Sequence, residues 1–350
     1  MHSHPMKKII DHTRCTFLPE WAPQQAVLLT LPHADTDWAY MLTEIHDCYR
    51  GILRALRGCG SPVHLLVRSR KEADEVLGAD LLCDVTLHVA DFNDTWIRDY
   101  GPLTISSPTG LLTLDFGFNG WGLKFASDRD NLVNLNMARE GFMPECYVNQ
   151  RDFVLEGGSV ETDGRGTLLT TTRCLCSPNR NGGLTKDEAE AELRRRLNVE
   201  HILWLDHGAL AGDDTDSHID TLARLAPHDT IIYTGCADHD DEHFHDLRLM
   251  AENLRAMRTP AGNPFNLVEL PLPDAIFDEE EGIRLPATYA NYLITNRKVL
   301  VPSYGQPQKD ELARLILESV FTDHTVESVD CRALIRQHGS LHCATMQIPS

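Results

Sequence analysis

The sequence contains no apolar run of the roughly 18 to 20 residues that a membrane-spanning helix requires. Basic residues are scarce: 32 Lys and Arg stand against 52 Asp and Glu, a formal net charge of −20. Such a charge repels nucleic-acid phosphates and anionic membranes, and it attracts small cations. The first residues also lack the apolar stretch of a secretory signal. We therefore expect a cytoplasmic protein that binds neither nucleic acid nor a membrane.

Metal-binding and nucleotide-binding signatures are missing as well. The ten cysteines are spread along the chain and form no CxxC pair, which argues against a structural zinc site and a disulfide framework. Neither GxGxxG nor GxxxxGK occurs, so no phosphate-binding loop is predicted. Free thiols are expected, and a functional cysteine must be recognised by its surroundings.

The 350 residues, 42% of them hydrophobic, are enough for a large buried core. Short apolar runs alternate with amphipathic segments, which predicts an α/β fold. No long linker interrupts the chain, so we expect a single catalytic domain over residues 1–350. Five strong helices are predicted at 41–56, 131–140, 186–197, 245–257 and 309–320, the third opened by a capping box of Thr185 and Glu188. Strands are predicted at 26–31, 63–67, 85–89, 111–116, 167–171, 202–205, 230–233, 267–270, 289–294 and 299–301.

Polar residues of catalytic type gather in four short segments that border predicted strands, where a rigid scaffold holds side chains around a pocket. The first, NDTWIRDYGP at 93–102, fits either a carboxylate held against an aromatic wall or a salt-bridged surface turn. The second, LEGGS at 155–159 followed by DGRGT at 163–167, places Glu156 beside two glycines. These glycines leave room for a ligand, although an ordinary hairpin would have the same sequence.

The third segment, AGDDTDSHID at 211–220, carries four carboxylates and one imidazole. In an extended backbone His218 and Asp220 point to one face, which places a base beside an anionic anchor. A solvated acidic loop and a divalent-metal site are the alternatives. The fourth, HGSLHCAT at 338–345, surrounds Cys343 with polar residues and a glycine, as an exposed nucleophilic thiol requires. The neighbouring His342 points to the opposite face of an extended chain and is a poor candidate for the base.

Residues 238–245, DHDDEHFH, have the composition of a dimanganese site of the ureohydrolase kind. The companion Asp-rich motif that such a site needs does not occur at a convincing distance. A charged loop leading into a helix is therefore preferred here.

Taken in order, the segments resemble the agmatine deiminase and bacterial-type peptidylarginine deiminase family of guanidine-modifying enzymes. The resemblance runs nearly end to end. It rests on WIRDYGP at 96–102, LEGGS with DGRGT at 155–167, NRN at 179–181, GDDTDSHID at 212–220, YANY at 289–292 and LHC at 341–343. Many agmatine deiminases have a run of glycines before Ile-His-Cys, where this chain has His338-Gly-Ser-Leu-His-Cys343.

The resemblance implies a pentein-like α/β propeller of five ββαβ modules around a pseudo-fivefold axis, which agrees with the five predicted helices. It implies neither a metal nor an organic cofactor, and the family leads us to expect a homodimer. By motif, the catalytic residues are the nucleophile Cys343, the general acid/base His218 and the guanidinium anchors Asp99 and Asp220. The expected substrate-binding residues are Trp96, Glu156, Asp214 and Asn291.

The implied reaction hydrolyses agmatine to N-carbamoylputrescine and ammonia through a covalent amidino-cysteine intermediate, a step toward putrescine and polyamines. The ammonium of agmatine needs an acceptor near the pocket mouth, for which the candidates are Asp213, Asp214 and Glu156. An arginine substrate needs a cation for its carboxylate, and the basic residues nearest the motifs are Arg98, Arg165 and Arg180. The alternatives are a peptidylarginine or free arginine deiminase, a dimanganese ureohydrolase, and a binding protein on an inactive scaffold.

Overall fold

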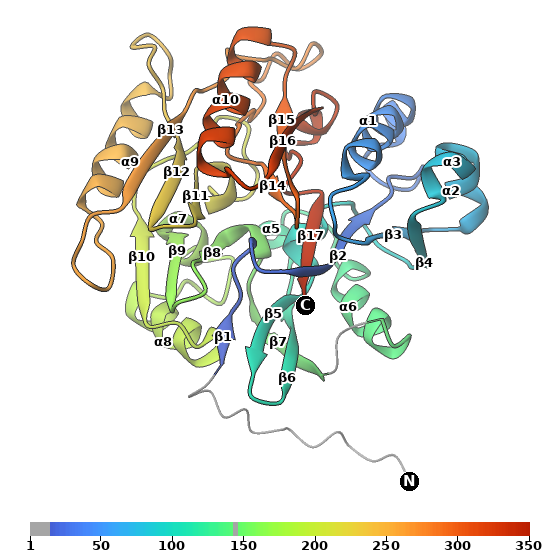
Figure 1. Cartoon of the computed structure of the whole chain (residues 1–350), viewed down its shortest axis with the longest axis horizontal. Helices are drawn as coiled ribbons and strands as arrows, with labels where there is room; N and C mark the ends of the chain where they lie inside the picture. The colour runs from blue at the N-terminus through green and yellow to red at the C-terminus, as the bar shows by residue number, and fades with distance from the viewer. Residues whose placement is uncertain (1–14, 143–145) are drawn as a thin grey trace.

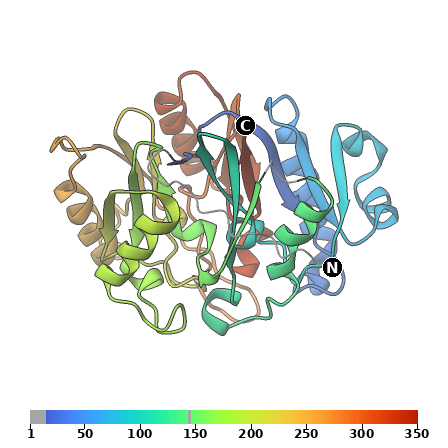
Figure 2. The same cartoon turned by 90° about the horizontal axis from the view of Figure 1, so that it is seen from below.

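The chain folds into five small sheets of three or four strands each, drawn from residues 15–142 and 146–350, which are the residues that this computed structural model describes. Residues 1–14, which we expect to lack a secretory signal, lie outside the described residues. The sheets follow one another around the middle of the molecule, with the long helices outside (Figure 1). Helices α1 (Leu42–Leu56) and α9 (Phe244–Ala256) lie at opposite flanks in both views (Figure 2). The predicted α/β class is confirmed.

Each sheet repeats one arrangement, in which an antiparallel pair is followed by a helix and a parallel strand. Parallel strands need a crossover of about a dozen residues or more, and in each of the five units this crossover contains one long helix. The five units are β5 (Leu103–Ser107), β6 (Gly110–Gly117), α6 (Asp130–Arg139), β7 (Cys146–Val154); β8 (Val160–Thr162), β9 (Thr167–Thr171), α8 (Lys186–Leu197), β10 (His201–Leu205); β11 (Ala223–Ala226), β12 (Thr230–Thr234), α9, β13 (Asn266–Leu270); β14 (Leu293–Ile294), β15 (Lys298–Ser303), α10 (Pro307–Val320), β16 (Thr325–Asp330); and β17 (Thr345–Pro349), β2 (Gln24–Thr30), α1, β3 (Val63–Val67).

Two of the sheets gain a fourth strand. Strand β1 (Thr16–Phe17) pairs with β5, and β4 (Val85–Val89) pairs with β3. In the fifth unit, β17 near the carboxyl terminus pairs antiparallel with β2 near the amino terminus. This pairing joins the two ends of the described chain in one sheet.

The five predicted helices all form, with ends within two residues of the prediction. The capping box that opens α8 is present: Thr185 Oγ1 accepts from the Glu188 N–H, and the Glu188 carboxylate accepts from the Thr185 N–H. The strand predicted at 289–294 is wrong over most of its length, because only Leu293–Ile294 pair with a neighbouring strand. The preceding residues turn instead, with the Ala290 N–H donating to Thr288 Oγ1.

Two expectations drawn from the composition, on membrane-spanning helices and on free thiols, can be compared with the structure. No helix in the described residues is long and apolar enough to cross a bilayer. All ten cysteines belong to those residues and carry free thiols, as expected.

Candidate active site

In each sheet, one short segment directly precedes the first strand of the antiparallel pair. These five segments come together at one site. They are α4 (Ile97–Tyr100), the 3₁₀ turns η3 (Gly157–Ser159) and η4 (Ile219–Thr221), and residues 289–292 and 341–344. The motifs found in the sequence coincide with these segments. The repeated topology therefore explains how residues far apart in the chain come together.

Cys343 lies at the floor of this place, with 6% of its surface exposed. The expected exposed thiol is therefore wrong, because the surrounding segments cover it. Its Sγ is 3.3 Å from Asn291 Nδ2 and 3.8 Å from Asp220 Oδ2. Asn291 also accepts hydrogen bonds from the backbone N–H groups of His342 and Cys343, at 2.8 and 3.3 Å. Asn291 thus fixes the backbone that carries the thiol. Burial and the Asp220 and Asp99 charges raise the pKa of Cys343 well above its usual value.

His218 is fully buried between two carboxylates. Its Nε2 is 3.1 Å from Glu156 Oε2, while its Nδ1 is 3.4 Å from Asp99 Oδ1 and has no hydrogen-bond partner. Burial lowers the pKa of His218, but Asp99, Cys174 and Glu156 outweigh burial and raise it well above its usual value. The ring is therefore an imidazolium at neutral pH, able to donate a proton from Nδ1.

Asp99 is held by two donors, the Gly158 N–H on Oδ1 and Trp121 Nε1 on Oδ2, both at 2.9 Å. Burial raises the pKa of Asp99 to about 6, although the neighbouring His218 opposes this shift. Asp99 therefore changes charge close to physiological pH. The sequence had not indicated Trp121, although it lies in a segment rich in glycine and aromatic residues.

Asp220 has one free oxygen and one held oxygen. Its Oδ1 is buried and has no hydrogen-bond partner, whereas its Oδ2 is 2.7 Å from His342 Nδ1. On the far side, His342 Nε2 is 2.6 Å from Glu20 Oε2. The prediction that His342 faces away from the thiol pocket fits this position behind Asp220. The sequence had not indicated that His342 would orient a predicted anchor.

Gly158 faces the space among these groups. A Cβ added to it would lie 2.7 Å from Asp99 Oδ1, 2.8 Å from His218 Nδ1 and 3.1 Å from Asp220 Oδ2. Glycine is therefore required there, because any side chain would collide with these three polar groups. His218 and Asp220 do face the same space, but the expected extended backbone is wrong, because residues 219–221 form a 3₁₀ turn.

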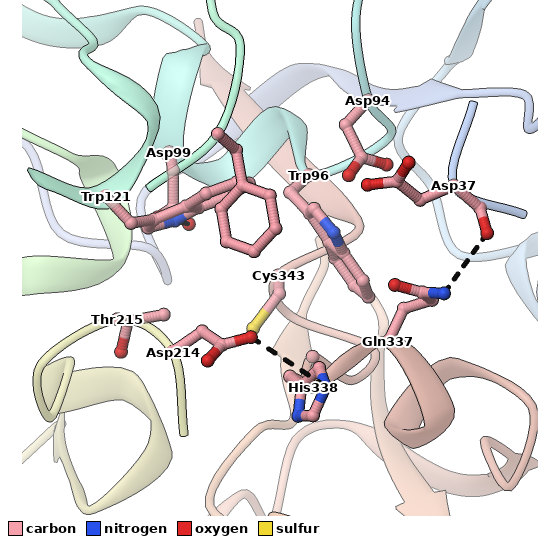
Figure 3. Close-up of a pocket in the computed structure, with 12 residues that line it drawn as sticks. Asp37, Asp94, Trp96, Asp99, Trp121, Asp214, Thr215, Gln337, His338 and Cys343 are labelled. Atoms are coloured by element: carbon pink, nitrogen blue, oxygen red, sulfur yellow. Dashed lines mark hydrogen bonds and ion pairs between the residues drawn. The ribbon is translucent and has the colours of Figure 1, made fainter. Parts of the chain in front are cut away.

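A pocket of about 430 Å³, part of it open to solvent, leads down to Cys343. Trp96, Asp99, Trp121 and Cys343 form its buried floor. Its mouth consists of the less buried residues Asp37, Phe125, Asp214, Gln337 and His338. Figure 3 shows Trp96 and Trp121 flanking the approach to Cys343, with Asp214 and His338 joined across the mouth. Of the described residues, no Lys or Arg lines this pocket.

The candidates for binding the far end of a substrate are placed very differently. Of the three proposed ammonium acceptors, Asp214 lines the mouth, whereas Asp213 accepts from Thr215 and Ser217, and Glu156 is buried against Arg180. The three arginines all point elsewhere: Arg98 donates to Gln347, Arg165 pairs with Asp229, and Arg180 bonds Glu156 and Asp216. Among the described residues, the pocket lining therefore offers carboxylates and no Lys or Arg to the far end of a ligand, while Lys124 outside the lining donates to the Asp214 carbonyl oxygen.

Two buried clusters have the spacing of metal ligands. They are Glu156, Cys174 and His218, and Glu20, Glu161 and His342. Each already contains an arginine: Arg180 bonds Glu156, and Arg224 bonds both Glu20 and Glu161. These guanidinium groups neutralise the carboxylates that a metal ion would need. In residues 238–245, Asp241 pairs with His243 and Arg284 just before α9, as expected for a charged loop leading into a helix.

Comparison with known proteins gives consistent matches over almost the whole chain. The model of the Porphyromonas-type peptidyl-arginine deiminase family matches residues 16–349. A relative from Shewanella sp. (strain MR-4), named "Putative agmatine deiminase", is 32% identical over 97% of this chain and 98% of its own length.

Two solved structures are similar in both sequence and fold. The "Putative Arginine Deiminase" from Porphyromonas gingivalis is 46% identical with a TM-score of 0.90, covering 96% of this chain and 99% of that one. A cysteine-to-serine variant of the C. jejuni agmatine deiminase, solved with substrate bound, is 37% identical with a TM-score of 0.89, covering 96% of each chain. With the family model matched from residue 16 to residue 349, the chain belongs to the Porphyromonas-type peptidyl-arginine deiminase family.

Proposed function

We propose that this protein is an agmatine deiminase, which hydrolyses agmatine to N-carbamoylputrescine and ammonia. The observation that carries the proposal is the combination of two carboxylates near a buried thiol with a pocket mouth that bears further carboxylates and, in the described part of the chain, no Lys or Arg. Relatives named agmatine deiminase support it. The product places the reaction on a route to putrescine and polyamines.

We place the guanidinium of the substrate at the floor of the pocket, beside Asp99 and Cys343 and within reach of Asp220. A planar guanidinium presents paired N–H donors, which carboxylates bind by charge-assisted hydrogen bonds. Asp220 Oδ1 and the Asp99 carboxylate supply the acceptors. We assign Trp96 and Trp121 to the walls around the alkyl chain, and Asn291 and Glu156 to holding Cys343 and His218.

Binding of the cation also favours ionisation of Cys343, because it offsets the two carboxylate charges that raise the thiol pKa. The Cys343 thiolate attacks the guanidinium carbon, and one C–N bond then breaks while His218 donates a proton to the leaving ammonia. An amidino-thioether remains on Cys343. His218 next takes a proton from a water molecule that attacks the same carbon, and the C–S bond breaks to release the ureido product.

The proposal also covers the architecture, cofactor requirement, location and oligomeric state of the enzyme. We propose that the five ββαβ units form a propeller around a pseudo-fivefold axis and that residues 1–350 are one catalytic domain. The equivalent position of the five site segments, each before an antiparallel pair, supports this arrangement. We further propose that the enzyme works without a metal or organic cofactor, in the cytoplasm, as a homodimer.

The proposal is tested by measuring ammonia and urea release from agmatine, L-arginine and a blocked arginine peptide, with EDTA present. We expect ammonia from agmatine, much less from the two arginine compounds, and none from the Cys343→Ala variant. If ammonia appeared only from the arginine compounds, the substrate would be an arginine compound instead of agmatine, and the proposed mechanism would stand. Urea release that EDTA abolishes would indicate a dimanganese ureohydrolase instead.

A further inference from the structure

We propose that His338 is a specificity-determining residue: together with Asp214, it binds the terminal ammonium of the substrate at the pocket mouth. This inference rests on the proposed function, since it concerns the far end of agmatine. It assigns a role to a residue that the sequence analysis placed in the fourth segment without giving it one. It also explains which chemical feature of a substrate the mouth selects, namely a primary ammonium rather than a carboxylate or an apolar end.

The position of His338 fits this role. Its side chain is 25% exposed and that of Asp214 is 40% exposed, whereas Cys343 at the floor is 6% exposed. A substrate with its guanidinium at the floor therefore extends outward past Trp96 toward these two side chains. Figure 3 shows them next to each other at the mouth, joined by a dashed line.

The hydrogen bonding of the ring leaves one nitrogen free for a ligand. His338 Nδ1 lies 2.7 Å from the Gly212 carbonyl oxygen. A carbonyl oxygen only accepts, so Nδ1 carries the proton in this bond. In the neutral ring, Nε2 then presents a lone pair toward the mouth.

The gap between the two side chains matches an ammonium group. His338 Nε2 and Asp214 Oδ2 are 3.8 Å apart, too far for a direct hydrogen bond. Both are acceptors, so they do not bond each other while the ring is neutral. One ammonium nitrogen can lie at about 2.9 Å from both atoms and donate to each.

The backbone at His338 makes glycine a suitable replacement for this residue. Its φ of +65° lies in the left-handed region, where a residue with a side chain is uncommon and strained. Glycine would adopt this conformation without strain. Replacing the histidine by glycine therefore removes the ring, together with its bond to the Gly212 carbonyl oxygen, without straining the backbone.

The test compares agmatine with pentylguanidine, in which a methyl group replaces the terminal ammonium, in the wild type and in His338→Gly. We expect kcat/KM for agmatine to fall about tenfold or more, because a hydrogen bond to a charged group is lost. With pentylguanidine the change should stay below about twofold, because that substrate makes no such bond. The matched control is His228→Gly, which also replaces a left-handed histidine, with φ +62°, in the turn between β11 and β12.

An equal loss on both substrates would mean that His338 is only structural, and no loss on either would mean that it does not contact the ammonium. Either result overturns the inference while the proposed function stands. If the wild type releases no ammonia from agmatine, the proposed function fails and this inference fails with it. Thermal unfolding of both variants shows whether the fold is retained.

Discussion

The charges around Cys343 oppose ionisation of its thiol until a cation arrives. Asp99 and Asp220 both raise the pKa of Cys343, and no arginine or lysine of the described residues lines the pocket to offset them. In the free enzyme, Cys343 is therefore a protonated thiol and not a reactive thiolate. A guanidinium bound between the two carboxylates adds its positive charge to that of His218, so the substrate contributes to activating the residue that attacks it.

The pKa of Asp99 makes substrate affinity depend on pH. Burial raises this pKa to about 6, so the carboxyl is neutral below that pH and cannot pair with the guanidinium. Affinity for agmatine should be flat above about pH 7 and fall by about tenfold per unit below pH 6. Calorimetry with the Cys343→Ala variant measures this without turnover.

The control for this experiment is the same measurement with Asp99→Asn added to Cys343→Ala. That variant should bind weakly at every pH, with no change near pH 6. Affinity that stays constant in Cys343→Ala from about pH 5 to about pH 8 would contradict the assignment.

Removing the Asp99 charge should make the free thiol more reactive even as it stops catalysis. Asp99→Asn removes one of the charges that raise the Cys343 pKa, so the thiolate population at about pH 8 should increase. We expect faster alkylation of Cys343 by iodoacetamide, followed by mass spectrometry of its peptide. Asp37→Asn at the mouth is the control, and slower alkylation in Asp99→Asn would show that the carboxylate does not oppose ionisation.

Gly158 tests how strictly catalysis depends on the positions of Asp99 and His218. The methyl group of Gly158→Ala would lie 2.7 Å from Asp99 Oδ1 and 2.8 Å from His218 Nδ1, so both side chains would have to move. We expect kcat/KM for agmatine to fall by about a hundredfold or more. Gly51→Ala in α1 is the control, because nothing lies within 4 Å of its new methyl group. Full activity in Gly158→Ala would show that turnover does not depend on these positions.

Among individual residues, sequence reasoning succeeded where a motif marked the chemistry. Trp96, Asp99, Glu156, His218, Asp220, Asn291 and Cys343 all come together in the structure, and Asp214 lies at the mouth. It failed for His338 and Trp121, whose contacts depend on the loops opposite them. Arg224 sits in a short strand between apolar residues, and nothing in that strand reveals that Glu20 and Glu161 surround it.

At the level of the elements, the long helices connect the strands of the sheets, whereas the short turns position the side chains of the site. Each long helix connects two parallel strands, and each short turn before an antiparallel pair brings a side chain to the site. The long helices were predictable because apolar residues recur at helical spacing over ten residues or more. The turns η3 and η4 were not, because three residues carry no periodicity and their conformation depends on neighbouring sheets.

The capping box of α8 should contribute to stability without affecting activity. Thr185→Ala removes the hydroxyl that accepts from the Glu188 N–H, so the free energy of unfolding should fall by about 1 kcal/mol. Urea unfolding measures this loss, and agmatine turnover should be unchanged. A change in turnover would mean that α8 is coupled to the site.

At the level of the whole molecule, one buried arginine connects several sheets behind the site. Arg224 in β11 donates to Glu20, to Glu161 in β8, and to the backbone carbonyls of residues 290 and 292. It is fully buried, and Glu20 in turn contacts His342 behind Asp220. The charge network that holds the sheets together therefore also orients a proposed guanidinium anchor.

Replacing Arg224 by methionine should destabilise the whole fold, because it leaves two buried carboxylates without their cation. We expect a loss of about 3–5 kcal/mol in the free energy of unfolding, measured with urea. Arg195→Met is the control, since Arg195 forms an exposed pair with Glu192 and should contribute much less. Equal effects of the two variants would show that the buried network is not what stabilises the fold.

The most direct test of the account is the mass of the protein during turnover. Wild-type enzyme mixed with agmatine and quenched in acid should gain the mass of agmatine less ammonia, with the addition located on Cys343. The Cys343→Ala variant should gain nothing and form no product. Product formation by that variant, or turnover with no adduct on Cys343, would contradict the account.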